Sequence, residues 1–331
     1  MNILVTGGAG YIGSHTVRQL CDAKFGVVVY DNFAKGHRQA IGPDAAIIDG
    51  DIRDQEKLAK VLKDNQIAAI VHFAAFSLVG ESMQQPSLYY NNNVAGTLSL
   101  LDTMLACGVD KIVFSSTAAV YGEPAVWPIT EAMPTVPTNV YGRTKLAIEQ
   151  MLADYAAAYK MTYVALRYFN AAGALTTGAI GEDHSPETHL IPLVLQAAAG
   201  KREAVAIFGD DYPTPDGTCI RDYIHVTDLA DAHVLALRHL LAGGPARAYN
   251  LGSETGYSVR QVIDRAKAIT GVNFPVNIVP RRPGDPAVLV ASSARIREEL
   301  GWQPRLSDLD TIISSAWRWH KSHPDGYGTK A

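Results

Sequence analysis

The segment NILVTGGAGYIGSH joins a short apolar run to a segment of helical period through a glycine-rich turn. Gly7, Gly10 and Gly13 fit the spacing GxxGxxG, and glycine permits both a tight turn and a close approach of the backbone to a pyrophosphate. The N–H groups of Tyr11 and Ile12 would then face the phosphates at the positive end of a helix. A purely structural turn is the alternative. The order of strand, turn and helix favours a dinucleotide-binding Rossmann-type fold.

Short runs rich in Val and Ile alternate with longer segments of helical period over the first half of the chain. These runs are NILVT, GVVVY, AAIID, AAIVHFAA, KIVFSS and VALRYFN. The alternation predicts an α/β fold with a Rossmann-type doubly wound parallel sheet. After RYFNAAGA the chain becomes rich in Gly, Thr, His and Pro, which indicates a second, smaller α/β lobe. We therefore expect a dinucleotide-binding domain over 1–172 and a substrate domain over 173–331, interleaved through a returning strand near 248–252.

Composition and charge argue against several classes of function. The formal net charge is -4 without a long run of like charge, so we expect no nucleic acid and no membrane surface as a partner. No export signal is visible, and no apolar stretch approaches the roughly 18 residues that a membrane span needs. Cys21, Cys107 and Cys219 are widely spaced without a CxxC pair, which favours a reducing cytoplasm. His184 and His189 have no third ligand at a suitable spacing, so no metal is expected.

Polar residues after the predicted strands indicate the identity of the dinucleotide. Asp31 in VVVYDN follows the second strand, where a carboxylate can accept hydrogen bonds from ribose hydroxyls and would repel a 2′-phosphate. NAD is therefore favoured over NADP, although Asp31 could instead cap a loop. Asp51 in DGDIRD is placed to meet the adenine edge. His72 in VHFAAF is interpreted as a packed, hydrogen-bonded histidine, and Phe73 and Ala74 as residues that line the dinucleotide.

The segment NVYGRTKLAIEQ places Tyr141 and Lys145 four residues apart, and therefore on one face of a helix. Thr117 in FSSTAAVYG follows another strand, at the sheet edge where ligands bind in open α/β folds. A free tyrosine has a pKa near 10. An ammonium about 4 Å away at an effective dielectric of about 20 contributes about 4 kcal/mol, which as an upper bound is about three pKa units. With the positive charge of bound NAD+ added, these residues predict a Tyr141 phenolate that acts as a base near neutral pH.

The motifs TGGAGYIGSHT, FSSTAAVYG, YGRTK, RYFNAAGA, DGTCIRDYIHVTDLA and RRPGDP occur in this order along nearly the whole chain. In these motifs the chain resembles the extended short-chain dehydrogenase/reductase family, and within it the epimerases that interconvert UDP-glucose and UDP-galactose. The resemblance implies hydride transfer from the sugar C4 to tightly bound NAD, a 4-keto intermediate, and return of the hydride to the other face. It also implies a homodimer formed through helices around Leu98 to Leu105 and Leu146 to Tyr155.

The resemblance assigns roles to residues of both lobes. It implies that Tyr141 is the acid/base and that Lys145 binds ribose and tunes the pKa of Tyr141. It also implies that Thr117 hydrogen-bonds the sugar hydroxyl and the Tyr141 phenol. Further cofactor contacts are implied for Asn32, Lys35, Asp51, Ile52, Phe73, Ala74, Ser77, Asn92, Ser115 and Tyr168. Contacts to a UDP-hexose substrate are implied for Phe169, Asn170, His189, Leu190, Ala206, Ile207, Phe208, Arg221, Arg282, Asp285 and Leu289.

Several positions depart from the pattern of many relatives. Ser77 replaces a Lys near the cofactor, and His189 replaces an Asn near the diphosphate. Leu289 stands where some relatives have a bulky Tyr, which suggests a pocket that also admits N-acetylated UDP-sugars. Ala118 and Ala119 occupy the places of the Asp-Glu pair with which related dehydratases eliminate water, so dehydration lacks its acid and base.

Two other functions stay open on the sequence alone. One is a UDP-uronate epimerase or decarboxylase of the same family, since a single Arg or Thr is enough to bind the extra carboxylate. The other is a non-catalytic NAD-binding sensor, against which the joint presence of Thr117, Tyr141 and Lys145 argues.

Overall fold

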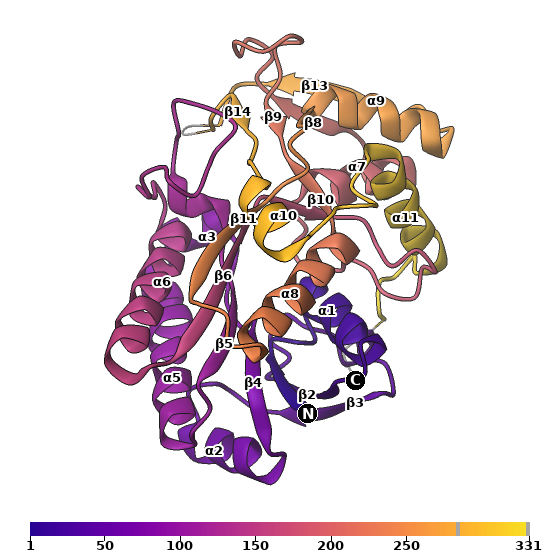
Figure 1. Cartoon of the computed structure of the whole chain (residues 1–331). Coiled ribbons are helices and arrows are strands. Elements are labelled where there is room, and N and C mark those ends of the chain that lie inside the picture. The colour runs from indigo at the N-terminus through magenta and orange to yellow at the C-terminus, as the bar shows by residue number, and fades with distance from the viewer. Residues whose placement is uncertain (283–284, 329–331) are drawn as a thin grey trace.

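The computed structural model describes residues 1–282 and 285–328, and its central layer is a seven-stranded sheet covered by helices on both faces (Figure 1). The strand order is β11-β6-β5-β4-β1-β2-β3, and every neighbouring pair is parallel. The strands are β1 (Asn2–Thr6), β2 (Gly26–Asp31), β3 (Ala45–Asp49), β4 (Ile67–His72), β5 (Lys111–Ser115), β6 (Thr162–Tyr168) and β11 (Arg247–Leu251). The predicted Rossmann-type doubly wound sheet is therefore confirmed.

Both faces of this sheet are buried, which explains why its strands read as continuous apolar runs. In β1, Ile3 and Val5 join the core on one face while Leu4 joins the core on the other. One face is covered by α1 (Tyr11–Asp22), α8 (Val226–Leu241) and α10 (Ala294–Leu300). The opposite face is covered by α2 (Gln55–Asp64), α5 (Gly96–Ala106) and α6 (Val140–Tyr159).

A second lobe lies at one end of the sheet, at the top of Figure 1. Its helices α7 (Leu190–Ala198), α9 (Val259–Thr270) and α11 (Leu309–Ser322) share one apolar core with short strands. The small sheets pair β8 (Val205–Phe208) with β13 (Val276–Val279), β7 (Asn170–Ala172) with β10 (Tyr223–His225), and β9 (Ile220–Arg221) with both β12 (Tyr257–Ser258) and β14 (Val288–Leu289). The second, smaller lobe expected from the turn-rich sequence is thus present.

The chain crosses between the lobes more than once. The helix α8 and the strand β11 come after residue 172, yet α8 packs against α1 and β11 pairs with β6 in the large sheet. The division into domains 1–172 and 173–331 remains a prediction, whereas the return of these segments follows from the pairing.

The strand order determines where a ligand can reach the backbone. Because β1 lies between β4 and β2, the chain leaves β1 in one direction and later returns on its other side, which is the switch point of an open α/β sheet. The loops that follow β1, β4, β5 and β6 therefore meet at the same carboxyl edge. The short helices α3 (Val79–Gln84) and α4 (Pro86–Tyr89) and a π-helical turn over Tyr90–Ala95 connect the loop after β4 to α5.

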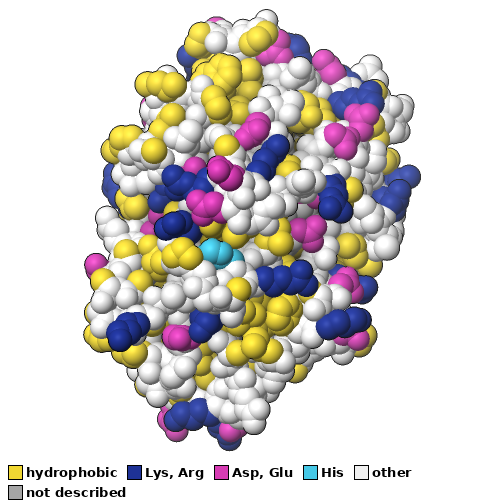
Figure 2. Space-filling view, in the orientation of Figure 1, with side chains coloured by type: hydrophobic (Ala, Val, Ile, Leu, Met, Phe, Trp, Pro, Cys, Tyr) yellow, Lys and Arg dark blue, Asp and Glu magenta, His cyan; other side chains and the backbone are white. Residues whose placement is uncertain are grey.

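The surface of the described residues is mixed in charge. Lys and Arg side chains are interspersed with Asp and Glu on the face drawn in Figure 2. Within residues 1–282 and 285–328, no helix combines the length and the apolar character that crossing a bilayer requires. The three cysteines form no disulfide.

A buried ion pair joins α6 to the sheet. Arg167 on β6 and Glu149 on α6 have side chains only 9% and 8% exposed, and their closest charged atoms lie 2.5 Å apart. The Arg167 guanidinium also donates to the Tyr121 hydroxyl at 2.8 Å, and that hydroxyl donates to Asn250 Oδ1 on β11 at 2.7 Å. The Ser116 hydroxyl donates to the Glu149 carboxylate. These contacts hold α6, β6, β11 and the end of β5 in fixed register.

We expect Arg167→Ala to lower the free energy of unfolding by about 3–5 kcal/mol, because the Glu149 carboxylate would stay buried without its partner. Equilibrium urea unfolding measures this loss. The matched control is Arg18→Ala, which removes a half-exposed pair with Asp22 and should change the free energy by at most about 1 kcal/mol. Equal losses in the two variants would contradict the assigned role of the buried pair.

Candidate active site

The glycine turn after β1 is shaped by close backbone packing. Gly7 has a φ of +71°, and a Cβ added there would lie 2.5 Å from Ala74 N; a Cβ on Gly13 would lie 2.3 Å from Gly7 O. At Gly10 the nearest protein atom to an added Cβ is Gly7 O at 3.4 Å, so packing against the protein does not require a glycine there. Close approach of a ligand to the backbone does explain the glycine at position 10. Gly10 caps α1 without a side-chain hydrogen bond, which leaves the first N–H groups of α1 for a phosphate.

Asp31 connects the loops after β1 and β2. Its carboxylate accepts hydrogen bonds from Ala9 N at 2.9 Å and Phe33 N at 2.8 Å, and the residue is buried. The loop-capping role is therefore present in the structure. It is compatible with a ribose contact, because an ionised carboxylate can accept about four hydrogen bonds. The two backbone donors orient the carboxylate beside the glycine turn, where the adenosine ribose of a dinucleotide would lie.

The other residues predicted for the cofactor fall into two groups. Phe73 N and Ala74 N donate to Thr6 O at 2.8 and 3.1 Å, which places the start of the loop after β4 beside the glycine turn. Asn32 donates to Asp51 at 3.0 Å, and hydrogen bonds from Arg53 lower the pKa of Asp51 to about 2.

The remainder are held mainly by protein contacts. The Ile52 side chain is buried in the core, so its backbone alone is available to a ligand. Lys35 Nζ donates to Ser185 O at 3.3 Å, and Asn92 donates to Asn93 Oδ1 at 3.0 Å. Ser77 is exposed in the loop after β4.

His72 is a packed residue, as interpreted from the sequence. It is 1% exposed, and its ring nitrogens hydrogen-bond the hydroxyls of Thr6 at 2.7 Å and Thr97 at 2.9 Å. Burial lowers its pKa to about 3. It therefore stays neutral and holds the ends of β1 and β4 together.

Local capping positions Thr117 and Tyr141. The Asn139 carboxamide accepts from Gly142 N at 2.8 Å and caps α6, so Tyr141 falls in the first helical turn. Thr117 begins a 3-10 helix over Ala118–Tyr121 and lies directly past the end of β5. The structure brings the two side chains close together: burial raises the pKa of Tyr141 to about 12, and the nearby Thr117 hydroxyl opposes that rise.

The Lys145 amine is held by the backbone at the end of β5. Its Nζ donates to Ser115 O at 2.8 Å and lies 5.9 Å from the centroid of the Tyr141 ring. Burial lowers the pKa of Lys145 to about 7, while the Glu149 carboxylate acts in the opposite sense. The protein's own groups leave the pKa of Tyr141 raised, because desolvation of the phenol outweighs them; the Tyr141 phenolate predicted with NAD+ bound stays a prediction.

Ser115 and Tyr168 lie beside this group of residues. Their hydroxyls hydrogen-bond each other across the ends of β5 and β6, and burial raises the pKa of Tyr168. Tyr168 also lies close enough for its charge and that of Tyr141 to disfavour each other. The Tyr168 hydroxyl is thus protonated at neutral pH and lies near Tyr141.

A pocket of about 260 Å³ opens in the second lobe. It collects most of the predicted substrate residues, namely Asn170, His189, Leu190, Ala206, Ile207, Phe208, Arg221, Arg282 and Asp285. Arg221 pairs with Asp285 at 2.7 Å, and the Arg282 guanidinium lies 3.7 Å from the centroid of the Phe208 ring. Arg202, which the sequence reasoning missed, also lines the pocket. Three guanidinium groups against one carboxylate suit a diphosphate, which arginine binds through paired donors.

Phe169 and Leu289 lie outside this lining. They pack against a small apolar cluster formed by Val120, Tyr121 and Ile129. This cluster includes part of the 3-10 helix that follows Thr117, and Leu289 on β14 is paired in register with Arg221 on β9. Phe169 and Leu289 therefore lie between the catalytic candidates Thr117 and Tyr141 and the arginine-lined pocket.

Sequence reasoning missed two supporting residues. Asn93 is fully buried, and its carboxamide accepts from Phe76 N and donates to Phe76 O and to the Thr144 hydroxyl. It thereby fixes the loop after β4 against α6. The second supporting residue is Glu149. It follows Tyr141 by eight residues on the same helical face, and this spacing was the sequence signal that could have identified it.

Comparisons with known proteins agree along the whole chain. Residues 3–252 match the NAD dependent epimerase/dehydratase family. A UDP-glucose 4-epimerase of Halalkalibacterium halodurans is 57% identical over 330 residues, which cover 100% of this chain and 98% of that protein. A crystal structure of a UDP-glucose 4-epimerase is 55% identical with a TM-score of 0.98, covering 99% of this chain and 100% of that chain. The UDP-glucose 4-epimerase of Bifidobacterium longum, crystallised in complex with NAD+ and UDP, is 42% identical with a TM-score of 0.93, covering 98% and 100%. The chain therefore belongs to the NAD dependent epimerase/dehydratase family.

Proposed function

We propose that the protein is an NAD-dependent isomerase that interconverts UDP-glucose and UDP-galactose through a 4-keto sugar. The observation that carries this proposal is the close approach of the Thr117 and Tyr141 side chains at the carboxyl edge of the sheet, which also carries the glycine turn. The arginine-lined pocket in the second lobe supports a nucleotide diphosphate as the anchor of the substrate. Similarity to UDP-glucose 4-epimerases over the whole chain supports the same activity.

Bound NAD+ supplies the hydride acceptor and a positively charged ring. Tyr141 moves the proton: its deprotonated oxygen takes the proton of the sugar O4 hydroxyl while the C4–H bond breaks and a C4 carbonyl forms. The reverse transfer returns the proton to O4 after the sugar has presented its other face. We infer that the Thr117 hydroxyl donates to the Tyr141 oxygen in the complex and so stabilises its anionic form.

The phenol is protonated in the protein alone, so its ionisation needs a further positive charge. Lys145 contributes little, because its amine is bound to Ser115 O and has a pKa of about 7. We infer that Lys145 holds the end of β5 and a ribose hydroxyl, and that the cofactor ring supplies the charge that makes Tyr141 a base. Ionisation of Tyr141 is thereby tied to the oxidised state of the cofactor.

The substrate must be held at one end and free at the other. Arg221, Arg282 and Asn170 are proposed to hold the diphosphate, with Ala206 to Phe208 beside the uracil. The hexose would then lie toward Phe169 and Leu289, where the surroundings are apolar. Weak contacts there let the 4-keto sugar turn over while the nucleotide stays bound.

We expect Tyr141→Phe to lower kcat for UDP-galactose at least about a hundredfold, because it removes a positioned acid/base. Tyr163→Phe, a change near the amino end of β6, is the control and should keep the parent's rate. Bound dinucleotide, measured after denaturation, should be the same in all three proteins. A parent that converts UDP-glucuronate but not UDP-galactose would favour the uronate alternative, and a parent inactive on both would favour the sensor.

The size of Leu289 supports a second substrate. Leucine at this position leaves more room beside Phe169 than a tyrosine would, so we propose that UDP-N-acetylglucosamine is also epimerised. Leu289→Tyr should lower turnover of the N-acetylated sugar at least about tenfold and spare UDP-glucose. Leu289→Met keeps the volume and is the control. Absence of turnover of UDP-N-acetylglucosamine by a parent that is active on UDP-glucose would refute this second activity.

We propose that the protein is a cytoplasmic homodimer. Leu98 and Leu105 on α5 are 43% and 40% exposed, and Tyr159 on α6 is 51% exposed. The Tyr155 hydroxyl donates to Asp102 at 2.5 Å, so these two helices form one surface. Pairing of this surface with a second copy would cover the apolar side chains, and three unpaired cysteines suit a reducing compartment. Sedimentation equilibrium tests the dimer, and a monomer at micromolar concentration would rule it out.

A further inference from the structure

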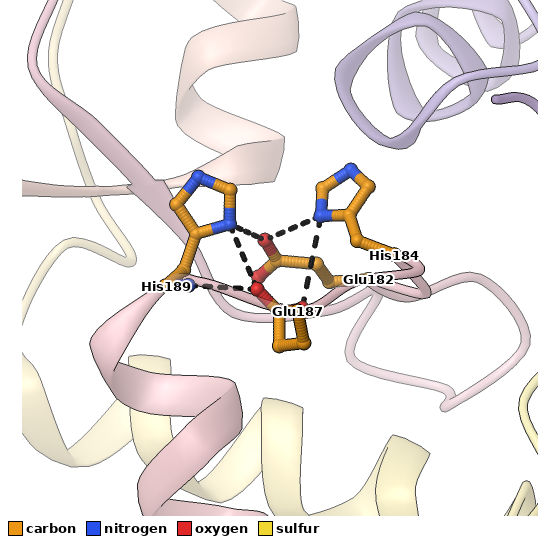
Figure 3. Close-up of side chains that lie close together, drawn as sticks. All are labelled: Glu182, His184, Glu187 and His189. Carbon is orange, nitrogen blue, oxygen red and sulfur yellow. Dashed lines mark hydrogen bonds and ion pairs between the residues drawn. The ribbon is translucent and has the colours of Figure 1, made fainter. Parts of the chain in front are cut away.

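Four potential metal ligands converge in the segment between β7 and α7. Glu182, His184, Glu187 and His189 each offer one ligand atom, and the four atoms lie within 4.8 Å of one another (Figure 3). The sequence-based reason against a metal was the lack of a third ligand beside the two histidines. That reason does not hold, because the fold places both glutamates against both imidazoles.

Four nitrogen–oxygen distances within this cluster are close to the edge length of a tetrahedral metal site. Nδ1 of His189 lies 2.8 Å from Glu182 Oε1 and 3.0 Å from Glu187 Oε1. Nδ1 of His184 lies 3.2 Å from Glu182 Oε1 and 3.7 Å from Glu187 Oε2. Zinc binds nitrogen and oxygen at about 2.0–2.1 Å in a tetrahedron, whose edges are then roughly 3.3 Å long.

Charge and hydrogen bonding also indicate a cation. The two glutamate side chains are each 6% exposed, and among the described residues no Lys or Arg forms an ion pair with either of them. Nδ1 of His184 is buried and makes no hydrogen bond, although two carboxylates lie near it. Its orientation is therefore poor for a direct N–H···O bond to either carboxylate. A nitrogen lone pair directed at a shared cation removes this mismatch and neutralises the two carboxylates.

We propose that Glu182, His184, Glu187 and His189 bind one divalent cation of the Zn²⁺ type with two nitrogen and two oxygen ligands. The epimerisation needs only a hydride and a proton, so the cation has a structural role. The site does not depend on the proposed substrate, because it is defined by its own ligand geometry.

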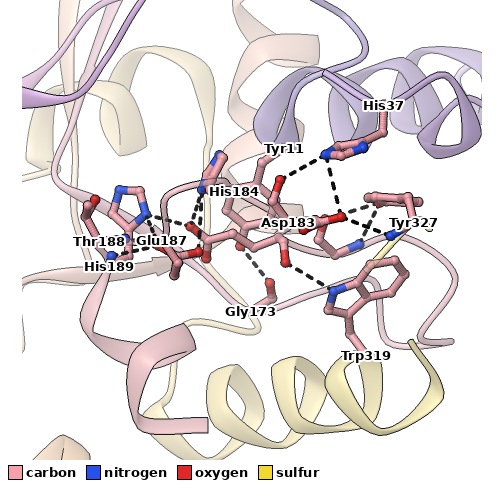
Figure 4. A network of polar contacts seen from close by, with 12 residues as sticks. Tyr11, His37, Gly173, Asp183, His184, Glu187, Thr188, His189, Trp319 and Tyr327 are labelled. Atoms are coloured by element: carbon pink, nitrogen blue, oxygen red, sulfur yellow. Dashed lines mark hydrogen bonds and ion pairs between the residues drawn. The ribbon is translucent and has the colours of Figure 1, made fainter. Parts of the chain in front are cut away.

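The position of the cluster shows what the cation would hold together. His189 caps α7 and lines the nucleotide pocket. The His184 ring lies 6.2 Å from the Tyr11 ring in an edge-on contact, and the Tyr11 hydroxyl donates to Gly173 O at 2.6 Å (Figure 4). Tyr11 also begins α1 after the glycine turn. The cation would therefore fix the segment that links the cofactor loop to the substrate pocket.

The test uses full-length protein without a histidine tag. Metal content is measured by inductively coupled plasma mass spectrometry, and Zn²⁺ is titrated into chelator-treated protein while the thermal unfolding midpoint is followed. We expect close to one zinc per chain and a midpoint that rises with Zn²⁺. His184→Asn and Glu187→Gln should weaken zinc binding at least about tenfold, whereas His239→Asn on α8 should not.

The parent protein decides the outcome even where a variant does not fold. Substoichiometric zinc together with a midpoint that Zn²⁺ leaves unchanged would overturn the proposal, and the cluster would then be two protonated imidazoles paired with two carboxylates. Zinc binding that persists unchanged in both His184→Asn and Glu187→Gln would place the metal elsewhere and would overturn it equally.

Discussion

The structure depends on the burial of one polar face of α6 against the carboxyl edge of the sheet. Tyr141, Lys145 and Glu149 are spaced by four residues; Lys145 and Glu149 are buried and Tyr141 is half-buried, so each needs a polar partner. The partners are the consecutive residues 115–117: the backbone carbonyl of the first accepts from Lys145, the hydroxyl of the second donates to Glu149, and the hydroxyl of the third lies beside Tyr141. One helical face is thus matched to one extended segment, and the geometry of the proposed catalytic residues follows from that match.

The same burial sets the chemistry. Desolvation raises the pKa of the Tyr141 phenol and lowers that of the Lys145 amine. At neutral pH the phenol is therefore protonated, and the amine is only partly charged. A phenol held protonated can act as a base only when a positive charge is brought near it. In the proposed reaction this charge comes and goes with the oxidation state of the cofactor, so that proton and hydride transfers are coupled at one site.

The sequence was sufficient for the sheet and for much of the pocket. The apolar strands, the glycine turn and the start of α6 are local patterns, and the motifs of the second lobe led to residues such as Arg221 and Asp285 that the fold does bring together. The partner of Lys145, the second role of Asp31 and the contact of both glutamates with His184 could not be predicted, because each depends on how distant segments approach. Desolvation of Tyr141 was underestimated for the same reason: burial is a property of the packed structure.

The dependence of Tyr141 ionisation on the cofactor tests this account most directly. Difference absorbance between the parent and Tyr141→Phe isolates the tyrosinate signal of this residue across a pH titration. Without dinucleotide the midpoint should be well above 10, in line with the pKa of about 12, and NAD+ should lower it toward neutrality while NADH, which lacks the ring charge, should not. A phenolate near pH 7 in the dinucleotide-free protein, or equal midpoints with NAD+ and NADH, would contradict the account.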